Sequence, residues 1–504
     1  MQNDLDRERG DRYDLSDVLH GRSLVIASNR GPIVYEKTDN GELVPRRGAG
    51  GLVTALTHVM RQASGLWVAS AMGTGDREMV KRQHDEHLEA PFDDDRLHLR
   101  YLTFDRDVFE RYYNRISNSV FWFLQHNMWN LPMHPRFTAA TREAWMSYHA
   151  VNQRFAEALA EEIAGTEKTA PVMLHDYHLM LVARYLRKLV PDAFSYHFTH
   201  SPWSQPDMWR VLPGRMAEDT LEGMLANDLL GFQSARWARN FIQCCEDILS
   251  AEVDHNEGLV RYMGTETTVR HYPISIEVES VRKLAHSDEA ARHLAWLDRM
   301  LDGRRLILRI DRLELSKNIV RGFRAYEEML KANPQWIGKV VHLALVYPSR
   351  RALSEYRTYE AEVLEVHDRI NEELGTDDWQ PIVLINEDNY IRALACSRRY
   401  DVLIVNPIAD GMNLVAKEGP AVNEVDGVLI LSTNAGAWFE LGHGAIGVNP
   451  YDVAEMAEAM HTALSMDASE RADLGSFLRQ VIEKNTPSKW VWYQLNDIRR
   501  LHEA

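Results

Sequence analysis

The sequence is short of cysteine, of long apolar runs and of positive charge. Its three cysteines, in a chain of 504 residues, are too few for a disulfide framework. The adjacent pair Cys244 and Cys245 stands in a helical stretch typical of buried free thiols. No stretch approaches the ~18 consecutive apolar residues that a membrane-spanning helix needs. Residues 1–20 are polar, of mixed charge and without the apolar core of a signal peptide, so we expect a flexible tail and a cytoplasmic protein.

The net charge of −17 excludes general nucleic-acid binding, which requires a positive field. Any site for a phosphate must therefore be a local basic pocket in an acidic protein. The hydrophobic and charged fractions, 45% and 26%, are typical of a folded globular protein. A chain of 504 residues is too long for one compact core, and its length alone indicates two to four domains.

Apolar runs, polar turns and helical patterns alternate along the whole chain. This order predicts an α/β protein with largely parallel sheets. We expect two Rossmann-like, doubly wound domains facing across a cleft, over residues 21–275 and 276–484. Residues 485–504 form an amphipathic pattern and are predicted to be a helix that packs back on the first domain. The predicted strands are 23–29, 171–176, 194–200, 304–311, 339–350, 401–407 and 427–433.

Charged and polar residues follow these strands at the end where open α/β sheets bind their ligands. In the first half they are Arg30, Asp176 and His200, and in the second half they are Arg312, Lys317, Arg350 and the segment 410–418. Two such sheets would present several cations, carboxylates and a histidine to one ligand. The Asp410-Gly411 pair that ends one strand is then a functional turn and not only a change of direction.

Arg312 and Lys317 combine a planar guanidinium with a mobile ammonium, which suits a diphosphate. A solvated surface turn is the alternative for this pair, and also for Arg350 in "PSRR". The stretch "RRGAGGL", residues 46–52, matches neither the dinucleotide fingerprint nor the P-loop. Its glycines could still bring backbone N–H groups against a phosphate, or form a plain loop.

Metal sites are weakly supported. His175 with His178, and His197 with His200, have spacings that could ligate zinc, but no cysteine or HExxH context accompanies them. The acidic runs 93–95 and 105–107 read as loop or helix-cap acids.

Residues 112–129 are unusually aromatic. A buried core helix is the simplest interpretation, but Tyr113 and Trp122 stand among polar residues and could stack on a sugar ring.

Taken in order, the motifs resemble those of the trehalose-6-phosphate synthase family, which are retaining glycosyltransferases of the two-domain GT-B architecture. The resemblance extends from about residue 23 to about residue 500. The segments that carry it include "SNR", "HDYHL", "LPGR", "DRLELSK", "PSR" and "DGMNLVAKE".

The resemblance implies transfer of glucose from a nucleotide sugar, expected to be UDP-glucose, to glucose 6-phosphate, giving α,α-trehalose 6-phosphate. It implies no metal or other cofactor and no enzyme nucleophile, because the leaving phosphate is thought to take the acceptor's proton. The expected ligands are the donor and the sugar-phosphate acceptor. A homo-oligomer and a downstream trehalose-phosphate phosphatase stay open as partners.

Residue by residue, the resemblance assigns a donor set, an acceptor set and a catalytic set. The donor set is Gly50, Gly51, Arg312, Lys317, Asp410, Asn413, Leu414, Val415 and Glu418. The acceptor set is Arg30, Tyr113, Trp122, Asp176 and Arg350. The catalytic set is His200, Asp410, Arg312 and Lys317.

Four single residues and the segment "HSPWSQPDMW", residues 200–209, depart from the family pattern. Glu314 and Asn318 replace an aspartate and a glycine, while Ser70 and Ala409 replace a tryptophan and an arginine. The donor set is intact, so two alternatives concern the acceptor side. One is another phosphorylated acceptor, such as glycerol 3-phosphate or a cyclitol phosphate, and the other is a non-catalytic sugar-phosphate sensor.

Overall fold

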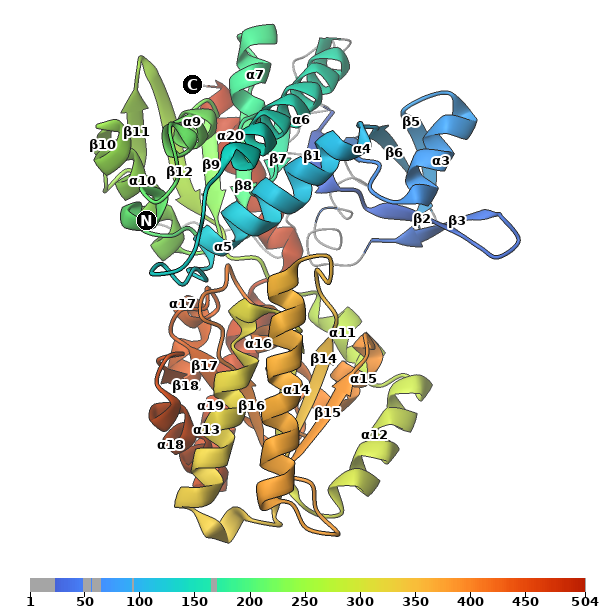
Figure 1. Ribbon diagram of the computed structural model, residues 1–504, viewed down its shortest axis with the longest axis vertical. Helices are drawn as coiled ribbons and strands as arrows, with labels where there is room; N and C mark the ends of the chain where they lie inside the picture. Colours follow the sequence, from blue (N-terminus) through green and yellow to red (C-terminus); the bar gives the residue numbers. More distant parts are fainter. Residues whose placement is uncertain (1–22, 49–55, 57–64, 93–94, 165–169, 504) are drawn as a thin grey trace. The chain divides into compact units, whose positions relative to one another are not determined.

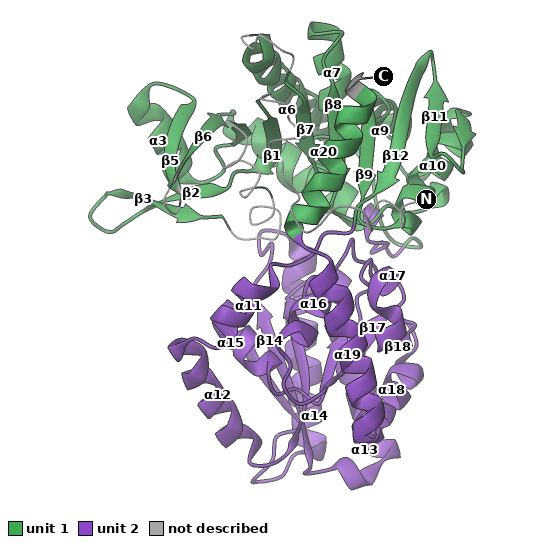
Figure 2. Cartoon of the chain, turned by 180° about the vertical axis from the view of Figure 1, so that it is seen from behind, with its two compact units in different colours: residues 1–124, 131–272, 487–504 green, residues 125–130, 273–486 purple. Residues whose placement is uncertain are grey.

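The computed structural model describes residues 23–48, 56, 65–92, 95–164 and 170–503. The chain divides into two compact units (Figure 2). Unit 1 takes in Met1–Leu124, Leu131–Tyr272 and Pro487–Ala504, and unit 2 takes in Gln125–Asn130 and Pro273–Thr486. Each unit is α/β with a large, mostly parallel sheet (Figure 1), which confirms the predicted fold class.

Unit 1 is built on a ten-stranded sheet of order β10-β11-β12-β9-β8-β7-β1-β4-β6-β5. The strands β7, β8 and β9 are buried along their whole length, as expected for parallel strands covered on both faces. The antiparallel pairs β10–β11, β11–β12 and β5–β6 complete the two edges. The strands are β1 (Val25–Arg30), β4 (Leu66–Ser70), β5 (His87–Phe92), β6 (Asp95–Leu102), β7 (Val172–His175), β8 (Ser195–Thr199), β9 (Leu229–Phe232), β10 (Glu252–Asp254), β11 (Leu259–Tyr262) and β12 (Thr265–His271), with a separate hairpin of β2 (Ile33–Lys37) and β3 (Leu43–Arg47).

The helices of unit 1 include one unusual element. The aromatic segment is a π-helix, η2 (Arg111–Phe121), which continues as the short α5 (Trp122–Gln125). The core-helix interpretation is right for its buried side, which includes Tyr112, Ile116 and Phe121, but the helix ends before residue 129. The other helices are α3 (Thr74–Gln83), α4 (Arg106–Glu110), α6 (Ala139–Ala164), α7 (Val182–Leu189), α8 (Pro206–Trp209), α9 (Met216–Met224) and α10 (Ala235–Leu249).

Unit 2 contains a six-stranded parallel sheet of order β15-β14-β13-β16-β17-β18. Numbered within the unit, this is the 3-2-1-4-5-6 order of dinucleotide-binding folds, whose ligand crevice lies where the order reverses, between β13 and β16. The strands are β13 (Arg305–Arg312), β14 (Val340–Tyr347), β15 (Ile382–Asn386), β16 (Val402–Val405), β17 (Val428–Ser432) and β18 (Ala445–Val448). The helices are α11 (Val278–Ala285), α12 (Asp288–Leu301), α13 (Ile319–Ala332), α14 (Ser354–Leu374), α15 (Tyr390–Ser397), α16 (Val415–Val422), α17 (Trp438–Leu441), α18 (Val453–Ser465) and α19 (Ala468–Lys484).

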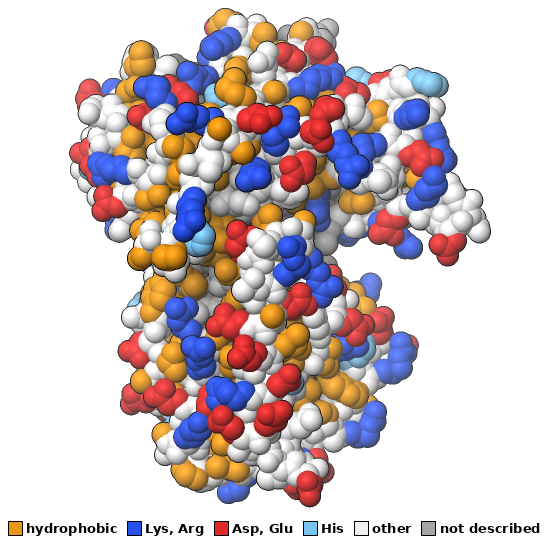
Figure 3. All heavy atoms as spheres, viewed as in Figure 1, with side chains coloured by type: hydrophobic (Ala, Val, Ile, Leu, Met, Phe, Trp, Pro, Cys, Tyr) orange, Lys and Arg blue, Asp and Glu red, His pale blue; other side chains and the backbone are white. Residues whose placement is uncertain are grey.

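All seven predicted strands are present, each within a few residues of its expected bounds. The three cysteines are buried and free, as expected. Within the described residues, no helix combines the length and apolarity needed to span a membrane. On the face drawn in Figure 3, basic and acidic side chains are interspersed, so this face carries no continuous basic surface of the described residues.

The last helix, α20 (Pro487–Glu503), belongs to unit 1 (Figure 2), which confirms that it packs back on the first domain. Trp490 is 2% exposed, and its indole N–H donates to the carbonyl of Tyr272 at 3.0 Å. The ring of Phe198 lies edge-on to the same indole at 5.2 Å. Trp490 therefore fixes α20 to strand β8 and to the end of the unit 1 segment at Tyr272.

Replacing this anchor should destabilise unit 1. We expect Trp490→Ala to lower the free energy of unfolding by about 3–5 kcal/mol, the usual cost of deleting a buried aromatic ring. The matched control is Trp492→Ala on the same helix, which removes a half-buried indole and should cost clearly less. Urea unfolding followed by circular dichroism measures both, and equal costs would show that Trp490 is not the anchor.

Candidate active site

The carboxyl ends of β13 and β16 bring three predicted residues together. The two strands are paired through Ile307 with Val402 and Leu308 with Leu403, so the chain that follows each strand leaves at the same edge of the sheet. There the ammonium of Lys317 lies 2.6 Å from Oδ2 of Asp410. The amide of Asn413 donates to the same carboxylate oxygen at 3.2 Å.

Both members of this ion pair are largely buried and charged. The side chains of Lys317 and Asp410 are 13% and 17% exposed. Burial alone would raise the pKa of Asp410, but the ammonium of Lys317 outweighs it and holds that pKa below its ordinary value. Burial likewise opposes the charged form of Lys317, and the carboxylate of Asp410 reverses this and raises its pKa. The pair is therefore an ammonium and a carboxylate at neutral pH.

Backbone contacts hold the turn that carries Asp410. Its N–H donates to the carbonyl of Asn434 at 3.2 Å, and its carbonyl accepts from the N–H of Gly436 at 3.0 Å. A Cβ at Gly436 would lie 1.8 Å from the carbonyl oxygen of Gly411, so only glycine fits there. Asn413 has a φ of +76°, a left-handed conformation that Asn tolerates better than most residues.

Helix α16 begins directly after this turn, and its adjacent charged residues Lys417 and Glu418 lie in different surroundings. Leu414 offers no side-chain cap to the first N–H groups of this helix, an arrangement that favours anions. Glu418 is half-buried and accepts a hydrogen bond from the hydroxyl of Tyr390 at 2.9 Å, while burial raises its pKa. Lys417 is 1% exposed and binds the carbonyl of Ile274 at 2.7 Å and Glu440 at 2.6 Å. Lys417 is thus part of the structure of unit 2, and Glu418 is the residue of the pair that can meet a ligand.

A second charged cluster joins Arg312 to Arg350 through a residue that sequence reasoning noted only as a departure. One oxygen of Glu314 lies 3.2 Å from Nη2 of Arg312, and the other lies 2.9 Å from Nη1 of Arg350. The Glu314 side chain is fully buried. Burial favours its protonated form, but the two guanidinium groups outweigh it and lower the pKa of Glu314 to about 2. The sequence placed both arginines near phosphates, but it did not indicate that they share a carboxylate.

Asn318 takes the place of a glycine in the family pattern and performs its backbone role. Its φ is +59°, which glycine and, less readily, asparagine adopt. Its amide donates to the carbonyls of Asn406 at 3.1 Å and Pro450 at 2.7 Å. These bonds fix the turn after Lys317 against the chain that follows β16 and the chain that follows β18.

In unit 1, Asp176 and His200 follow the neighbouring parallel strands β7 and β8. The carboxylate of Asp176 accepts hydrogen bonds from the backbone N–H groups of His200 at 3.2 Å and Ser201 at 3.3 Å. Burial nevertheless raises the pKa of Asp176 to about 6. Nε2 of His200 lies 3.3 Å from Nδ1 of His175, and Nδ1 of His200 lies 3.2 Å from Nε2 of Gln233. Burial lowers the pKa of His200 to about 3. At neutral pH this pair is a carboxylate beside a neutral imidazole.

The remaining predicted residues of unit 1 occupy different settings. The ring of Tyr113 is stacked at 5.8 Å on both Phe109 and His178. Trp122 is 8% exposed, and its ring lies 5.5 Å from that of Tyr177. Arg30 ends β1 and is exposed, and within the described part of the chain it makes no ion pair. Gly50 and Gly51 lie outside the described residues.

The other sequence features resolve as follows. Across the described ranges, no group of three potential metal ligands is found, and His175 contacts His200 instead. Asp105 caps α4 by accepting from two backbone N–H groups, which confirms the helix-cap reading of residues 105–107. Ser70 donates to Oδ1 of Asn29 at 3.2 Å, and Ala409 is 2% exposed.

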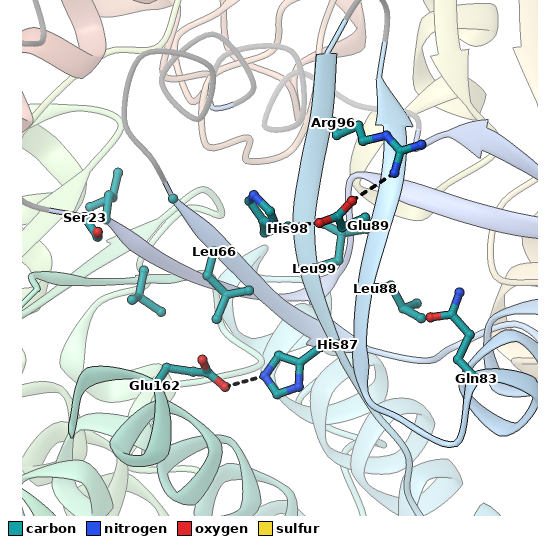
Figure 4. A pocket seen from close by; sticks show the side chains of 13 residues that line it. Ser23, Leu66, Gln83, His87, Leu88, Glu89, Arg96, His98, Leu99 and Glu162 are labelled. Carbon is teal, nitrogen blue, oxygen red and sulfur yellow. Dashed lines mark hydrogen bonds and ion pairs between the residues drawn. The ribbon is translucent and has the colours of Figure 1, made fainter. Parts of the chain in front are cut away.

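A cavity of about 670 Å³ in unit 1 is separate from all these residues. Its lining includes Leu24, Leu66 and Leu99, near the amino ends of β1, β4 and β6, whereas the predicted site residues follow the carboxyl ends. Figure 4 shows Glu162 hydrogen-bonded to His87, and Glu89 paired with Arg96, around it. None of the predicted site residues lines this cavity.

A sequence profile described as Glycosyltransferase family 20 matches residues 22–500. The chain belongs to glycosyltransferase family 20. Among its relatives in that family is a UDP-forming alpha,alpha-trehalose-phosphate synthase of Schizosaccharomyces pombe, which is 32% identical over 96% of this chain and 92% of that protein.

Solved structures of family 20 relatives have the same fold. An Escherichia coli structure, bound with UDP-2-fluoro glucose, has a TM-score of 0.82 and 29% identity, over 95% of this chain and 99% of the other. A Burkholderia xenovorans alpha,alpha-trehalose-phosphate synthase in complex with glucose-6-phosphate has a TM-score of 0.81 and 26% identity, over 95% and 100%. The fold of this glycosyltransferase is therefore that of its family.

The close approach at Gly436 gives a test of how the Asp410 turn is held. We expect Gly436→Ala to cost about 1–3 kcal/mol of stability, because the new methyl group must push against a backbone carbonyl. The matched control is Gly475→Ala in α19, where a Cβ would meet side-chain ends and no backbone: Nη1 of Arg479 at 3.2 Å and Oδ1 of Asp426 at 3.3 Å. Thermal unfolding compares the two, and a Gly436→Ala variant as stable as the wild type would contradict the account of this turn.

Proposed function

We propose that this protein transfers glucose from UDP-glucose to glucose 6-phosphate with retention, releasing UDP and α,α-trehalose 6-phosphate. The observation that carries the proposal is the cluster of Arg312, Lys317 and Asp410 beyond the ends of β13 and β16, in a chain of glycosyltransferase family 20. Relatives over nearly the whole chain are UDP-forming trehalose-phosphate synthases.

On the donor side, Arg312 and Lys317 bind the diphosphate. Their positive charge stabilises the negative charge that develops as the glycosidic bond to the diphosphate breaks. The uncapped start of α16, at Leu414 and Val415, adds backbone N–H groups for the same anion. In this proposal the two cations take the place of a metal ion.

The two carboxylates of unit 2 bind hydroxyl groups of the donor. Asp410 accepts from the glucose, and Lys317 and Asn413 already hold its carboxylate in place. Glu418 accepts from the ribose, with Tyr390 holding its carboxylate from the other side. Carboxylates suit this task because each can accept from two adjacent hydroxyls.

On the acceptor side, Arg350 binds the 6-phosphate and Asp176 binds sugar hydroxyls, with Arg30, Tyr113 and Trp122 completing the set. His200 remains neutral because its pKa is about 3, so it lies beside the donor glucose as a neutral imidazole and does not act as a general acid. No residue is assigned as a nucleophile. Catalysis then depends on positioning and on charge stabilisation at the leaving diphosphate.

Nucleoside diphosphate release by the purified protein tests this proposal. UDP-, GDP- and ADP-glucose are supplied in parallel, each alone and with glucose 6-phosphate, glycerol 3-phosphate or a cyclitol phosphate. The products are identified by mass spectrometry. We expect UDP release that depends on glucose 6-phosphate and yields a disaccharide phosphate. Turnover only with glycerol 3-phosphate or a cyclitol phosphate, or binding without turnover, would contradict the proposal.

Lys317 gives the sharpest substitution on the donor side. We expect Lys317→Ala to lower kcat roughly 10²–10³-fold, the scale for losing one group that stabilises transition-state charge. Lys331→Ala is the control, because its ammonium is 53% exposed and pairs with Glu327 away from the site. Steady-state rates measure both, and a near-normal rate for Lys317→Ala would remove this lysine from the site.

The raised pKa of Asp176 predicts a pH dependence on the acceptor side. Because burial places that pKa at about 6, lowering the pH through this value protonates the carboxylate that accepts the sugar hydroxyls. We therefore expect the ratio of kcat/KM for glucose 6-phosphate, wild type over Asp176→Asn, to fall toward one between about pH 8 and pH 5. The phosphate group also titrates near pH 6, but it does so in both enzymes and cancels in the ratio. A ratio that does not change with pH would contradict this role.

A further inference from the structure

We propose that Glu314 is a positioning residue that keeps Arg312 and Arg350 on two different phosphate groups, the leaving diphosphate and the acceptor phosphate. This role rests on the proposed function, which supplies the two anions. The Glu314 carboxylate contacts both guanidinium groups.

The two oxygens of the Glu314 carboxylate face different arginines. Oε2 faces Arg312 at 3.2 Å, and Oε1 faces Arg350 at 2.9 Å. The hydroxyl of Tyr356 lies 3.3 Å from Oε1 and 3.2 Å from Nη1 of Arg350, closing a triangle on the Arg350 side. A fully buried carboxylate held at three points has little freedom to turn toward either arginine alone.

A carboxylate is needed between the two arginines because the sheet brings them close together. Arg312 ends β13, Tyr347 ends the paired strand β14 directly beside it, and Arg350 follows three residues later. Their side chains are 35% and 15% exposed, so each keeps a surface that an anion can reach. One guanidinium group can bind two oxygens of a phosphate at once, and two neighbouring guanidinium groups could bind the same phosphate. With Glu314 between them, they stay apart.

Arg350 is fixed by more than this ion pair. Its φ is +39°, a left-handed conformation that non-glycine residues rarely adopt and that clusters at functional sites. Its guanidinium also lies 5.8 Å from the ring centroid of Tyr356, within cation–π range. The surroundings therefore determine where the guanidinium points, and Glu314 supplies the opposing charge.

Electrostatics separates this role from a merely structural one. Removing the charge of Glu314 takes away the negative charge that the two guanidinium groups share, so the affinity for a small anion should rise. The separation of the two guanidinium groups is lost at the same time, so turnover should fall. A general loss of structure in the site would instead lower both the affinity for a small anion and the turnover.

The test compares the wild type with Glu314→Gln, which removes the charge at nearly constant shape. We expect kcat to fall about 10–100-fold, while inorganic phosphate inhibits at least about threefold more strongly. Phosphate should also become competitive with UDP-glucose as well as with glucose 6-phosphate. Unchanged kcat, or weaker inhibition by phosphate, would overturn the proposal.

Two further variants control for charge and for folding. Glu314→Asp keeps the charge on a shorter side chain, and we expect it to restore most of the turnover and of the phosphate selectivity. Glu327→Gln is the matched control, because that carboxylate also pairs with two cations, Arg369 and Lys331, in the same unit. We expect it to leave both readouts unchanged. If Glu314→Gln does not fold, Glu314→Asp alone tests the proposal. A Glu314→Asp variant with wild-type phosphate selectivity but no turnover would contradict the positioning role.

Calorimetry separates this proposal from the proposed function. UDP is titrated into the protein with and without inorganic phosphate, and no turnover is required. In the wild type we expect UDP affinity to be unaffected by phosphate, and in Glu314→Gln we expect phosphate to weaken UDP binding. Equal behaviour of the two proteins would overturn the role of Glu314, whereas absence of turnover in the wild type with this difference intact would overturn only the proposed function.

Discussion

The pairing of buried charges at the carboxyl edge of the unit 2 sheet is the constraint on which the rest of the site depends. A site for phosphates needs cations in a partly buried place, and an unpaired buried cation costs several kcal/mol. Here Lys317 is held by Asp410, while Arg312 and Arg350 are held by Glu314. The same carboxylates set the direction of each cation before any ligand arrives, which lowers the cost of ordering the site on binding.

The charges at Asp176, His197 and His200 of unit 1 differ from those of the unit 2 cluster. His197 is buried and His200 is half-buried, and both are neutral because their pKa values are lowered to about 3. Asp176 is held by backbone N–H groups and, among the described residues, pairs with no cation. Neutral rings and a carboxylate suit hydroxyl groups, whereas the cations of unit 2 suit phosphates. This difference follows from the residue types that come after β7 and β8 in unit 1 and after β13, β14 and β16 in unit 2.

Much of this arrangement could be predicted from the sequence. Strand periodicity located seven strands, and the rule that ligands bind beyond strand ends singled out Lys317 and Asp410, which are 93 residues apart and form an ion pair. The rule works because neighbouring parallel strands end at one edge, whatever their separation in the chain.

Other features had no local signal. Glu314 reads as an ordinary turn residue, because its tie to Arg350 spans 36 residues and depends on strand pairing. The π-helix at Arg111–Phe121 is too short for its period to be told from that of an α-helix in the sequence. Lys417 and Glu418 are adjacent and equally polar, and only burial separates the structural residue from the one that can meet a ligand.

A crystal structure of the protein with UDP and glucose 6-phosphate bound together would show which cations hold which phosphate. We expect the diphosphate of UDP on Arg312 and Lys317, the 6-phosphate on Arg350, and the Glu314 carboxylate still in contact with both arginines. A diphosphate bound away from Arg312 and Lys317, or one phosphate held by both arginines, would contradict this expectation.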